Sequence, residues 1–225
     1  MASSTLFELV NIVLRTTGDL DELTDNTLGT TVALAPSGIG KRIVDMLNLT
    51  IGKIERESNW AQLRENSVGT TDGVNDTYEI STVNDVKQGA PVAVWITDSG
   101  RLEEVTAEQF DKLRADGGSA AGIPQYFQRG VSATGNMSVQ LYPMPATGYT
   151  VNVSGYRKAT KFSQPPVDTE TTDFNDDLLT TGALMHLDVY DGQPRGYDGL
   201  FIDLLASAKL EAISNRQVHI EVERY

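Results

Sequence analysis

Apolar residues recur every three or four positions near both ends of the chain, which predicts amphipathic helices. The first such segment places Leu6, Leu9 and Val13 on one face and closes at Gly18, a residue type that commonly follows a helix. The second opens at Pro36, and proline suits the first turn of a helix. The predicted helices span residues 5–17, 36–60, 174–191 and 197–215.

The middle of the chain alternates apolar and polar residues instead, which is typical of half-buried strands. Residues 91–96 form a continuous apolar run and predict a further strand. Thr106, followed three residues later by Gln109, is a capping-box pattern and predicts a short helix that ends at Gly117. The predicted strands are 78–83, 91–96, 126–128, 137–141 and 149–153.

The last two of these strands flank a proline-rich connection, and we predict that they form a hairpin. Its turn runs from Pro143 to Gly148. Proline fixes the backbone and cannot donate a hydrogen bond to a neighbouring strand, so it stiffens the turn and protects an exposed edge. No catalytic group lies in this stretch, which favours a structural role. The hairpin residues are Tyr142, Pro143, Pro145 and Tyr149.

The order of these elements predicts an α+β fold rather than an alternation of strands and helices along a parallel sheet. The simplest packing buries the two N-terminal helices against the two C-terminal helices as a helical bundle. The strands between them then form an inserted β-rich domain. The predicted parts are 1–65 with 168–215 for the bundle, 66–167 for the inserted domain and 216–225 for an extended C-terminal arm.

The C-terminal arm alternates apolar and polar residues from Gln217 to Glu223, which predicts a strand. Nothing in the chain beyond the last helix could pair with it. Because exposed strand edges are normally paired or covered, strand addition to a neighbouring or partner subunit is the favoured interpretation. A frayed terminus is the alternative. The arm residues expected to make contact are Val218, Ile220, Val222 and Tyr225.

Composition and charge exclude several classes of protein. Of the 225 residues 40% are hydrophobic, as in globular chains, and none is cysteine, which excludes disulfides and thiolate metal sites. The formal net charge of -13 opposes tight binding to a phosphate backbone, although an acidic surface can line a path along which DNA slides. We expect no signal peptide, because Glu8 and Arg15 interrupt the first apolar run, and no membrane span.

Several patterns resemble known sites but fit structural roles better. Residues 37–42 lack the first glycine and the final serine or threonine of a phosphate-binding loop, so we interpret them as a helix start. Acidic residues cluster at 168–177 without the glycine or final glutamate of a calcium loop. We therefore place them at the start of the helix near Phe174, with a metal site as the alternative. Glu103 and Glu104 could form a carboxylate pair for glycoside hydrolysis, but a chain with 31 acidic residues always contains such pairs.

Three large side chains are expected in the interior. His186 has apolar neighbours on a predicted helix, which favours a packed, hydrogen-bonded histidine over a metal ligand. Trp60 and Trp95 are expected to anchor the core. We therefore expect no catalytic residue, no cofactor, no metal and no enzymatic activity.

Several stretches in this order resemble phage head–tail adaptor proteins, in particular tail tubular protein A and the gatekeeper-type adaptors of tailed phages. The likeness extends over about residues 5–213 and includes the opening helix with Leu9, Val10 and Asn11. The stretches that carry it most clearly are 105–115, 122–127, 141–145, 149–158 and 174–183.

The resemblance implies a virion protein of the head–tail interface that is assembled in the host cytoplasm. Such adaptors form a ring of about twelve subunits below the portal, with DNA passing through the centre. The helical domain would dock on the portal, the β-rich domain would face the tail or nozzle protein, and the C-terminal arm would reach the portal. A stopper or tail-completion protein is the alternative within virion proteins. A carbohydrate-binding or carbohydrate-cleaving tail component is the alternative from another class.

Overall fold

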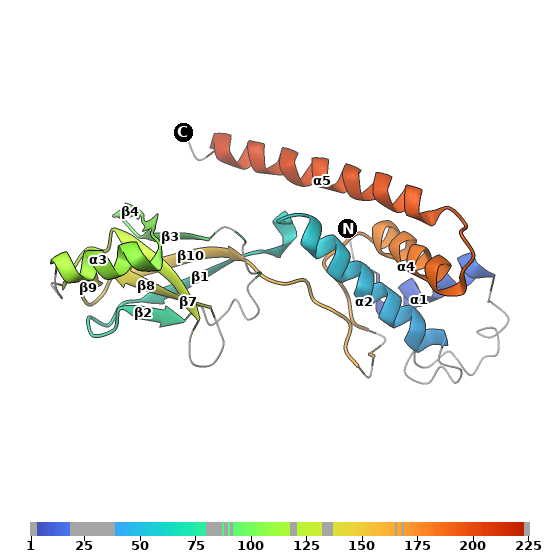
Figure 1. Ribbon diagram of the computed structural model, residues 1–225, viewed down its shortest axis with the longest axis horizontal. Coiled ribbons are helices and arrows are strands. Elements are labelled where there is room, and N and C mark those ends of the chain that lie inside the picture. Colours follow the sequence, from blue (N-terminus) through green and yellow to red (C-terminus); the bar gives the residue numbers. More distant parts are fainter. Residues whose placement is uncertain are drawn as a thin grey trace. The chain divides into compact units, whose positions relative to one another are not determined.

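The structure is a computed structural model. It describes residues 4–18, 39–79, 87, 90, 92–117, 121–131, 137–164, 166–167 and 169–222, and for residues 213–222 it describes the backbone alone. The chain divides into two compact units (Figure 1). The helical unit comprises Met1–Gln62 and Ala159–Tyr225, and the β unit comprises Leu63–Lys158. The predicted α+β class is confirmed.

Four α-helices build the described part of the helical unit. Helix α4 packs against the other three and is buried along almost its whole length, from Leu178 to Asp188. Its residues are apolar or small on every side, which is typical of a helix surrounded by others. The helices are α1 (Leu6–Thr17), α2 (Ile39–Glu57), α4 (Asp176–Asp191) and α5 (Tyr197–Val222), and a short 3-10 turn, η4 (Ala61–Leu63), follows α2.

Side chains cap the first turns of α1 and α4. Thr5 and Glu8 form a reciprocal capping box, in which the Thr5 N–H donates to Glu8 Oε2 at 2.8 Å and the Glu8 N–H donates to Thr5 Oγ1 at 3.4 Å. At α4, Asn175 Oδ1 accepts from the Asp177 N–H at 2.8 Å. Asp176 and Asp177 occupy the first turn, where negative charge is favourable, so the helix-start interpretation is confirmed for these two acids.

The chain returns from the β unit along α2. The side-chain amide of Asn48 forms two hydrogen bonds with the backbone of Phe162. Asn48 Nδ2 donates to the Phe162 carbonyl oxygen at 3.1 Å, and Asn48 Oδ1 accepts from the Phe162 N–H at 2.9 Å. Residues 159–167, which we expected in the inserted domain, therefore lie in the helical unit. Trp60 is buried and packs edge-on against Phe174, with ring centroids 5.7 Å apart, which confirms Trp60 as a core anchor.

Two four-stranded sheets form most of the β unit. Sheet A has the order β1-β10-β3-β4, and sheet B has the order β2-β8-β7-β5. In sheet A the strands are β1 (Arg64–Thr70), β10 (Thr150–Tyr156), β3 (Ala93–Ile96) and β4 (Gly100–Arg101). In sheet B they are β2 (Thr77–Glu79), β8 (Met137–Tyr142), β7 (Tyr126–Val131) and β5 (Glu103–Glu104). A two-stranded parallel pair joins β6 (Ala121–Gly122) to β9 (Met144–Pro145).

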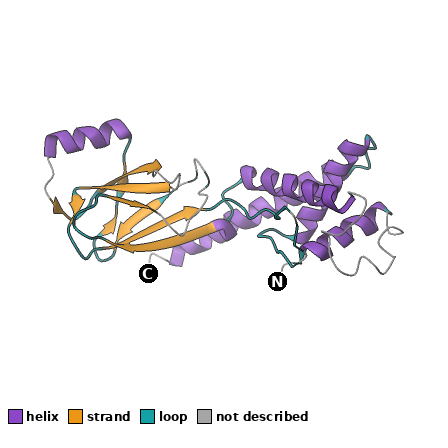
Figure 2. Ribbon diagram, turned by 90° about the horizontal axis from the view of Figure 1, so that it is seen from below, coloured by secondary structure: helices purple, strands orange, loops and turns teal. Residues whose placement is uncertain are grey.

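The two sheets share one hydrophobic core. Alternate residues of strands from both sheets meet in it, and its buried members are Val92, Val94, Ile96, Leu102, Phe127, Val139, Leu141, Val151 and Val153. Helix α3 (Ala107–Gly117) lies outside the strands (Figure 2). It buries Phe110 against Tyr142 of sheet B, with ring centroids 6.1 Å apart. The predicted capping box opens α3, because the Gln109 N–H donates to Thr106 Oγ1 and the Thr106 N–H donates to Gln109 Oε1.

The predicted hairpin between β8 and β10 is wrong. β8 belongs to sheet B and β10 to sheet A, so the connection from Tyr142 to Tyr149 carries the chain from one sheet to the other. Both strands alternate because each buries one face in the shared core. Alternation shows which residues point inward, but it does not show which strand is the hydrogen-bonded neighbour.

The predicted extended C-terminal arm is also wrong as far as Val222, because α5 continues without a break from Tyr197 to Val222. Each residue that extends an existing helix adds one backbone hydrogen bond. A strand without a neighbouring strand gains no backbone hydrogen bonds. The alternation of apolar and polar residues from Gln217 to Glu223 therefore does not stop α5 from continuing as a helix.

Candidate functional site

The residues of the predicted hairpin lie in the connection between the two sheets. Tyr142 packs on α3, as described above, and Pro145 is buried in the β6–β9 pair, where it lies opposite Gly122. Tyr149 packs at the edge of the shared core. Pro143 lies between β8 and β9 and is partly exposed. These four residues therefore lie in the connection between the two sheets, where Tyr142, Pro145 and Tyr149 are packed against the rest of the β unit.

The loop after β1 is bound closely to this connection. Thr71 donates its N–H to the Tyr149 carbonyl at 2.9 Å and its hydroxyl to the Ala146 carbonyl at 2.5 Å. In the same loop, the Asp72 carboxylate accepts hydrogen bonds from the backbone N–H groups of Asn75 and Val74. These bonds, together with one from the Asn75 side chain, lower the pKa of Asp72 to about 2. These hydrogen bonds within the loop stabilise its conformation.

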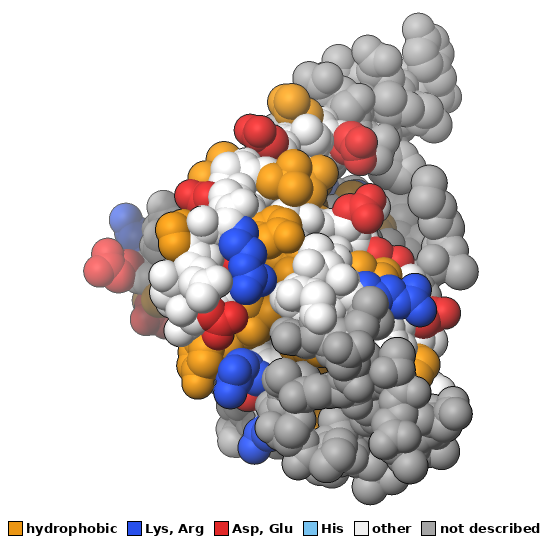
Figure 3. Space-filling view, turned by 90° about the vertical axis from the view of Figure 1, so that its right-hand side faces the viewer, with side chains coloured by type: hydrophobic (Ala, Val, Ile, Leu, Met, Phe, Trp, Pro, Cys, Tyr) orange, Lys and Arg blue, Asp and Glu red, His pale blue; other side chains and the backbone are white. Residues whose placement is uncertain are grey.

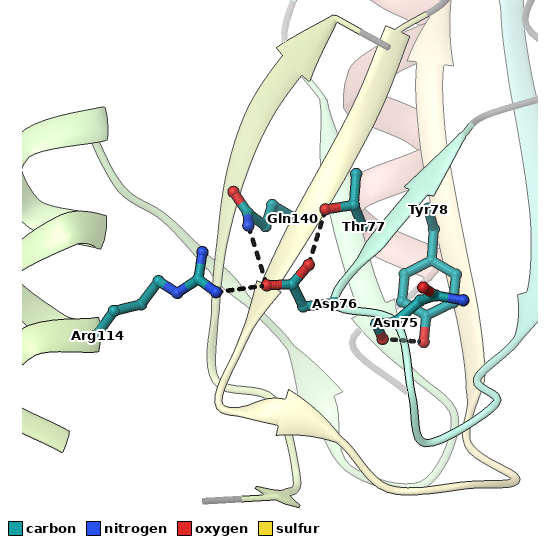
Figure 4. A network of polar contacts seen from close by, with 6 residues as sticks. All are labelled: Asn75, Asp76, Thr77, Tyr78, Arg114 and Gln140. Atoms are coloured by element: carbon teal, nitrogen blue, oxygen red, sulfur yellow. Dashed lines mark hydrogen bonds and ion pairs between the residues drawn. The ribbon is translucent and has the colours of Figure 1, made fainter. Parts of the chain in front are cut away.

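Asp76 connects α3 to sheet B (Figure 4). Its carboxylate lies 3.1 Å from Arg114 of α3 and accepts a hydrogen bond from Gln140 of β8 at 3.0 Å. The Thr77 hydroxyl donates to its second oxygen at 2.8 Å. The network fixes α3 on the sheet in addition to the Phe110 contact. We find in it no arrangement of acid, base and nucleophile that would serve catalysis.

The residues expected to contact the portal are separated from this region in sequence. Val218, Ile220 and Val222 belong to the last part of α5, and Tyr225 lies outside the described residues. The structure describes no side-chain contact for any of these residues. Their contact with the portal therefore stays a prediction.

Exposed apolar residues flank the corner between α4 and α5, and they were not anticipated from the sequence. Val189 is 79% exposed and Tyr190 is 60% exposed, and Leu200 and Ile202 follow on α5. We call these four residues the α4–α5 patch. Figure 3 shows hydrophobic side chains at this end of the helical unit, with lysine or arginine side chains among them. The guanidinium carbon of Arg42 lies 4.5 Å from the centre of the Tyr190 ring.

The turn beneath the α4–α5 patch is well defined. The Asp188 carbonyl accepts hydrogen bonds from the Gly192 and Gln193 N–H groups, and the Asp188 carboxylate accepts from the Arg195 N–H at 2.8 Å. Gly192 adopts the left-handed conformation that ends many helices, with φ of 67°. The apolar patch is therefore presented by a fixed corner between two helices.

Trp95 is the residue for which the sequence interpretation fails most clearly. Its neighbours Val94 and Ile96 face the core, so Trp95 points to the other side of sheet A and is partly exposed there. The continuous apolar run at 91–96 concealed this alternation. Trp95 is thus a surface aromatic residue rather than a core anchor.

His186 is partly buried, but its Nε2 atom has no hydrogen-bond partner in the described part of the chain, contrary to the expectation of a hydrogen-bonded histidine. Burial, and to a smaller extent the charge of Lys53, lower the pKa of His186. Among the described residues no group of three histidine or acidic side chains could hold a metal ion. None of the described helices is long and apolar enough to cross a membrane.

Comparison with known families identifies the class. A family model described as SU10 adaptor protein matches residues 4–220, which is nearly the whole chain. The chain therefore belongs to the SU10 adaptor protein family, and the expected relation to phage adaptor proteins is confirmed. Family membership implies a structural, virion-associated protein that interacts with other head or tail proteins of a phage. No curated protein matches the chain.

Proposed function

We propose that this adaptor joins the portal of a tailed phage to its tail or nozzle. About twelve copies form a ring with a central channel for DNA, through repeated contacts between neighbouring copies. The helical unit docks on the portal and the β unit faces the tail. The observation that carries this assignment is the α4–α5 patch, a set of exposed apolar residues around one helix corner of a chain of the adaptor family.

The α4–α5 patch has the properties of a protein-binding surface. Exposed apolar clusters on soluble proteins commonly mark interaction sites. Tyrosine and arginine are enriched among the residues that dominate binding energy, and Tyr190 and Arg42 are stacked here before any partner binds. Because the corner beneath them is fixed, little conformational entropy is lost on docking.

The C-terminal end of the chain supplies a second portal contact in this proposal, through Val218, Ile220, Val222 and Tyr225. The helical conformation of α5 up to Val222 changes the expected mode of contact. A helix seated in a groove of the portal replaces the strand addition that the sequence pattern suggested. Deletion of residues 216–225 should weaken portal binding.

The net charge of -13 suits a protein through whose ring DNA passes. Phosphate backbones adhere to lysine and arginine surfaces, and an acidic channel wall repels them at short range. DNA then moves through the channel without sequence-specific binding.

Co-sedimentation with purified portal rings tests the assignment of the portal-binding face. Tyr190→Asp places a charge in the α4–α5 patch and should weaken binding at least about tenfold, as expected for a central interface residue. Val74→Asp is the matched control, because Val74 is 77% exposed but lies in the β unit. Equal binding of both variants and the unmodified protein would contradict docking through the patch.

A further inference from the structure

The β unit has two opposite outer surfaces. Sheets A and B enclose the core, and α3 covers the far side of sheet B through Phe110 and Tyr142. The far side of sheet A has no such cover, since none of the described residues of the β unit forms an element packed over it. We call this side the sheet A face, and the solvent side of α3 the α3 face.

The sheet A face carries one row of four residues across its four strands. The strand register places Val68 opposite Asn152, Asn152 opposite Trp95, and Trp95 opposite Arg101. The sequence neighbours of these residues on β3 and β10 point into the core, so the row itself points outward. Four adjacent strands make this row about 15 Å wide, at about 4.8 Å between strands.

The sheet A face carries residue types that are typical of the centre of a protein–protein interface. Val68 is 66% exposed, Arg101 is exposed and Trp95 is partly exposed. Arg64 adds a second positive charge, held against the sheet by a hydrogen bond from its Nε to Ser154 Oγ at 2.9 Å. Tryptophan and arginine are enriched among binding hot spots, and Trp95 and Arg101 are neighbours in the row. The exposed Val68, at the other end of the row, adds apolar area.

The α3 face has the opposite charge. With Phe110 turned toward the sheet, Glu108, Asp111 and Asp116 are exposed on the helix, and Lys112 is the basic residue among them. Arg114 is engaged by Asp76 at 3.1 Å and so adds little to this surface. The two outer surfaces of one β unit are therefore electrostatically complementary.

We propose that the sheet A face of one copy binds the α3 face of the next copy around the ring. The proposal rests on the ring described under the proposed function and names the surfaces that form it. A contact between two unlike faces is heterologous, and it generates a ring when the rotation from one copy to the next closes. A symmetric pairing of two sheet A faces would bring Arg64 and Arg101 toward their own copies, which like-charge repulsion disfavours.

Cross-linking between introduced cysteines tests the contact, because the natural chain has no cysteine. We would combine Val68→Cys on the sheet A face with Ala115→Cys, an exposed position on α3. A flexible bis-maleimide reagent, added to the assembled protein alone and on portal rings, should then give a ladder of covalent oligomers. Each single-cysteine variant is a control and should give no covalent oligomers, since the two faces meet only each other.

The outcomes separate this contact from the proposed function. A ladder restricted to the double variant supports the contact. Adaptor rings on the portal without a ladder would overturn the contact and leave the adaptor function standing. Dimers from either single variant would show a symmetric contact and would also overturn it. Complete absence of self-association, both free and on the portal, would overturn the ring itself.

A charge exchange tests the electrostatic part independently. Arg101→Glu should lower the association of copies by about tenfold, as should Asp111→Arg, because each places like charges across the contact. The variant that carries both substitutions should recover most of the loss. Lys41→Glu, on an exposed position of α2, is the control and should leave association unchanged. Failure of the double variant to recover would contradict a direct pairing of the two faces.

Discussion

Gly182 of α4 lies so close to Thr50 of α2 that no side chain fits between them. A Cβ atom at position 182 would overlap the Thr50 Cγ2 atom and would come 2.8 Å from Cε2 of the Phe201 ring of α5. Thr50 and Phe201 are themselves completely buried. The glycine therefore sets how closely three helices of the helical unit approach one another.

Gly182→Ala should destabilise the helical unit by about 1–3 kcal/mol, because an extra methyl group in a packed core forces its neighbours to move. This loss should outweigh the gain of about 1 kcal/mol that alanine normally brings to a helix. Gly199→Ala is the matched control, since no atom lies within 4 Å of a Cβ at that position of α5. It should be neutral or stabilising in urea unfolding, and equal behaviour of both variants would contradict the close packing.

Asn48→Ala should lower the free energy of unfolding by about 1–3 kcal/mol, because both backbone groups of Phe162 lose their hydrogen-bond partner. Gln164→Ala removes another contact between the same segment and α2, to Asp45, but at an exposed site. That control should change stability by less than about 0.5 kcal/mol. Both are measured by urea unfolding, and a small effect of Asn48→Ala would show that the pairing is dispensable.

Asp72 should titrate in the folded protein well below its ordinary range. Its pKa falls from 3.8 to about 2, first through the Asn75 and Val74 N–H groups. A lowered pKa means that the ionised carboxylate stabilises the fold above pH 3.8, and that this contribution disappears as the pH falls toward about 2. NMR titration of the carboxyl carbon measures the value directly. Asn75→Ala removes one of the donors and should raise the pKa of Asp72 part of the way to 3.8.

His186 should make the helical unit less stable in mild acid. Burial and the charge of Lys53 lower its pKa below 6.5, so the folded state takes up a proton less readily than the unfolded state. Stability should therefore be greatest above pH 6.5 and should fall as the pH drops below it. His186→Gln should reduce this dependence in urea unfolding, and an unchanged pH dependence would contradict the assignment to His186.

The parts of the fold that depend on neighbouring residues were predictable from the sequence. The capping box of Thr106 and Gln109 opens α3, and Asp176 and Asp177 lie at the start of α4, because helix ends are specified by side chains within one turn. The expected order of helices, strands and helices is also the observed order.

The parts that depend on distant residues were not predictable. β8 and β10 show the same alternation whether they pair with each other or face each other across a core, so their assignment to two sheets was missed. Trp95 was missed because an apolar run does not reveal that only one face of the strand is covered. The α4–α5 patch was missed because helical spacing alone does not show which apolar residues of α4 and α5 lack a neighbour.

Electron microscopy of the purified protein mixed with the portal ring of its phage tests the central claim most directly. The adaptor assignment predicts a ring of added density at one end of the portal, with an open centre and the helical units against the portal. Bare portals beside free monomers, at concentrations well above micromolar, would contradict it. That result would favour a stopper or tail-completion protein that acts lower in the tail.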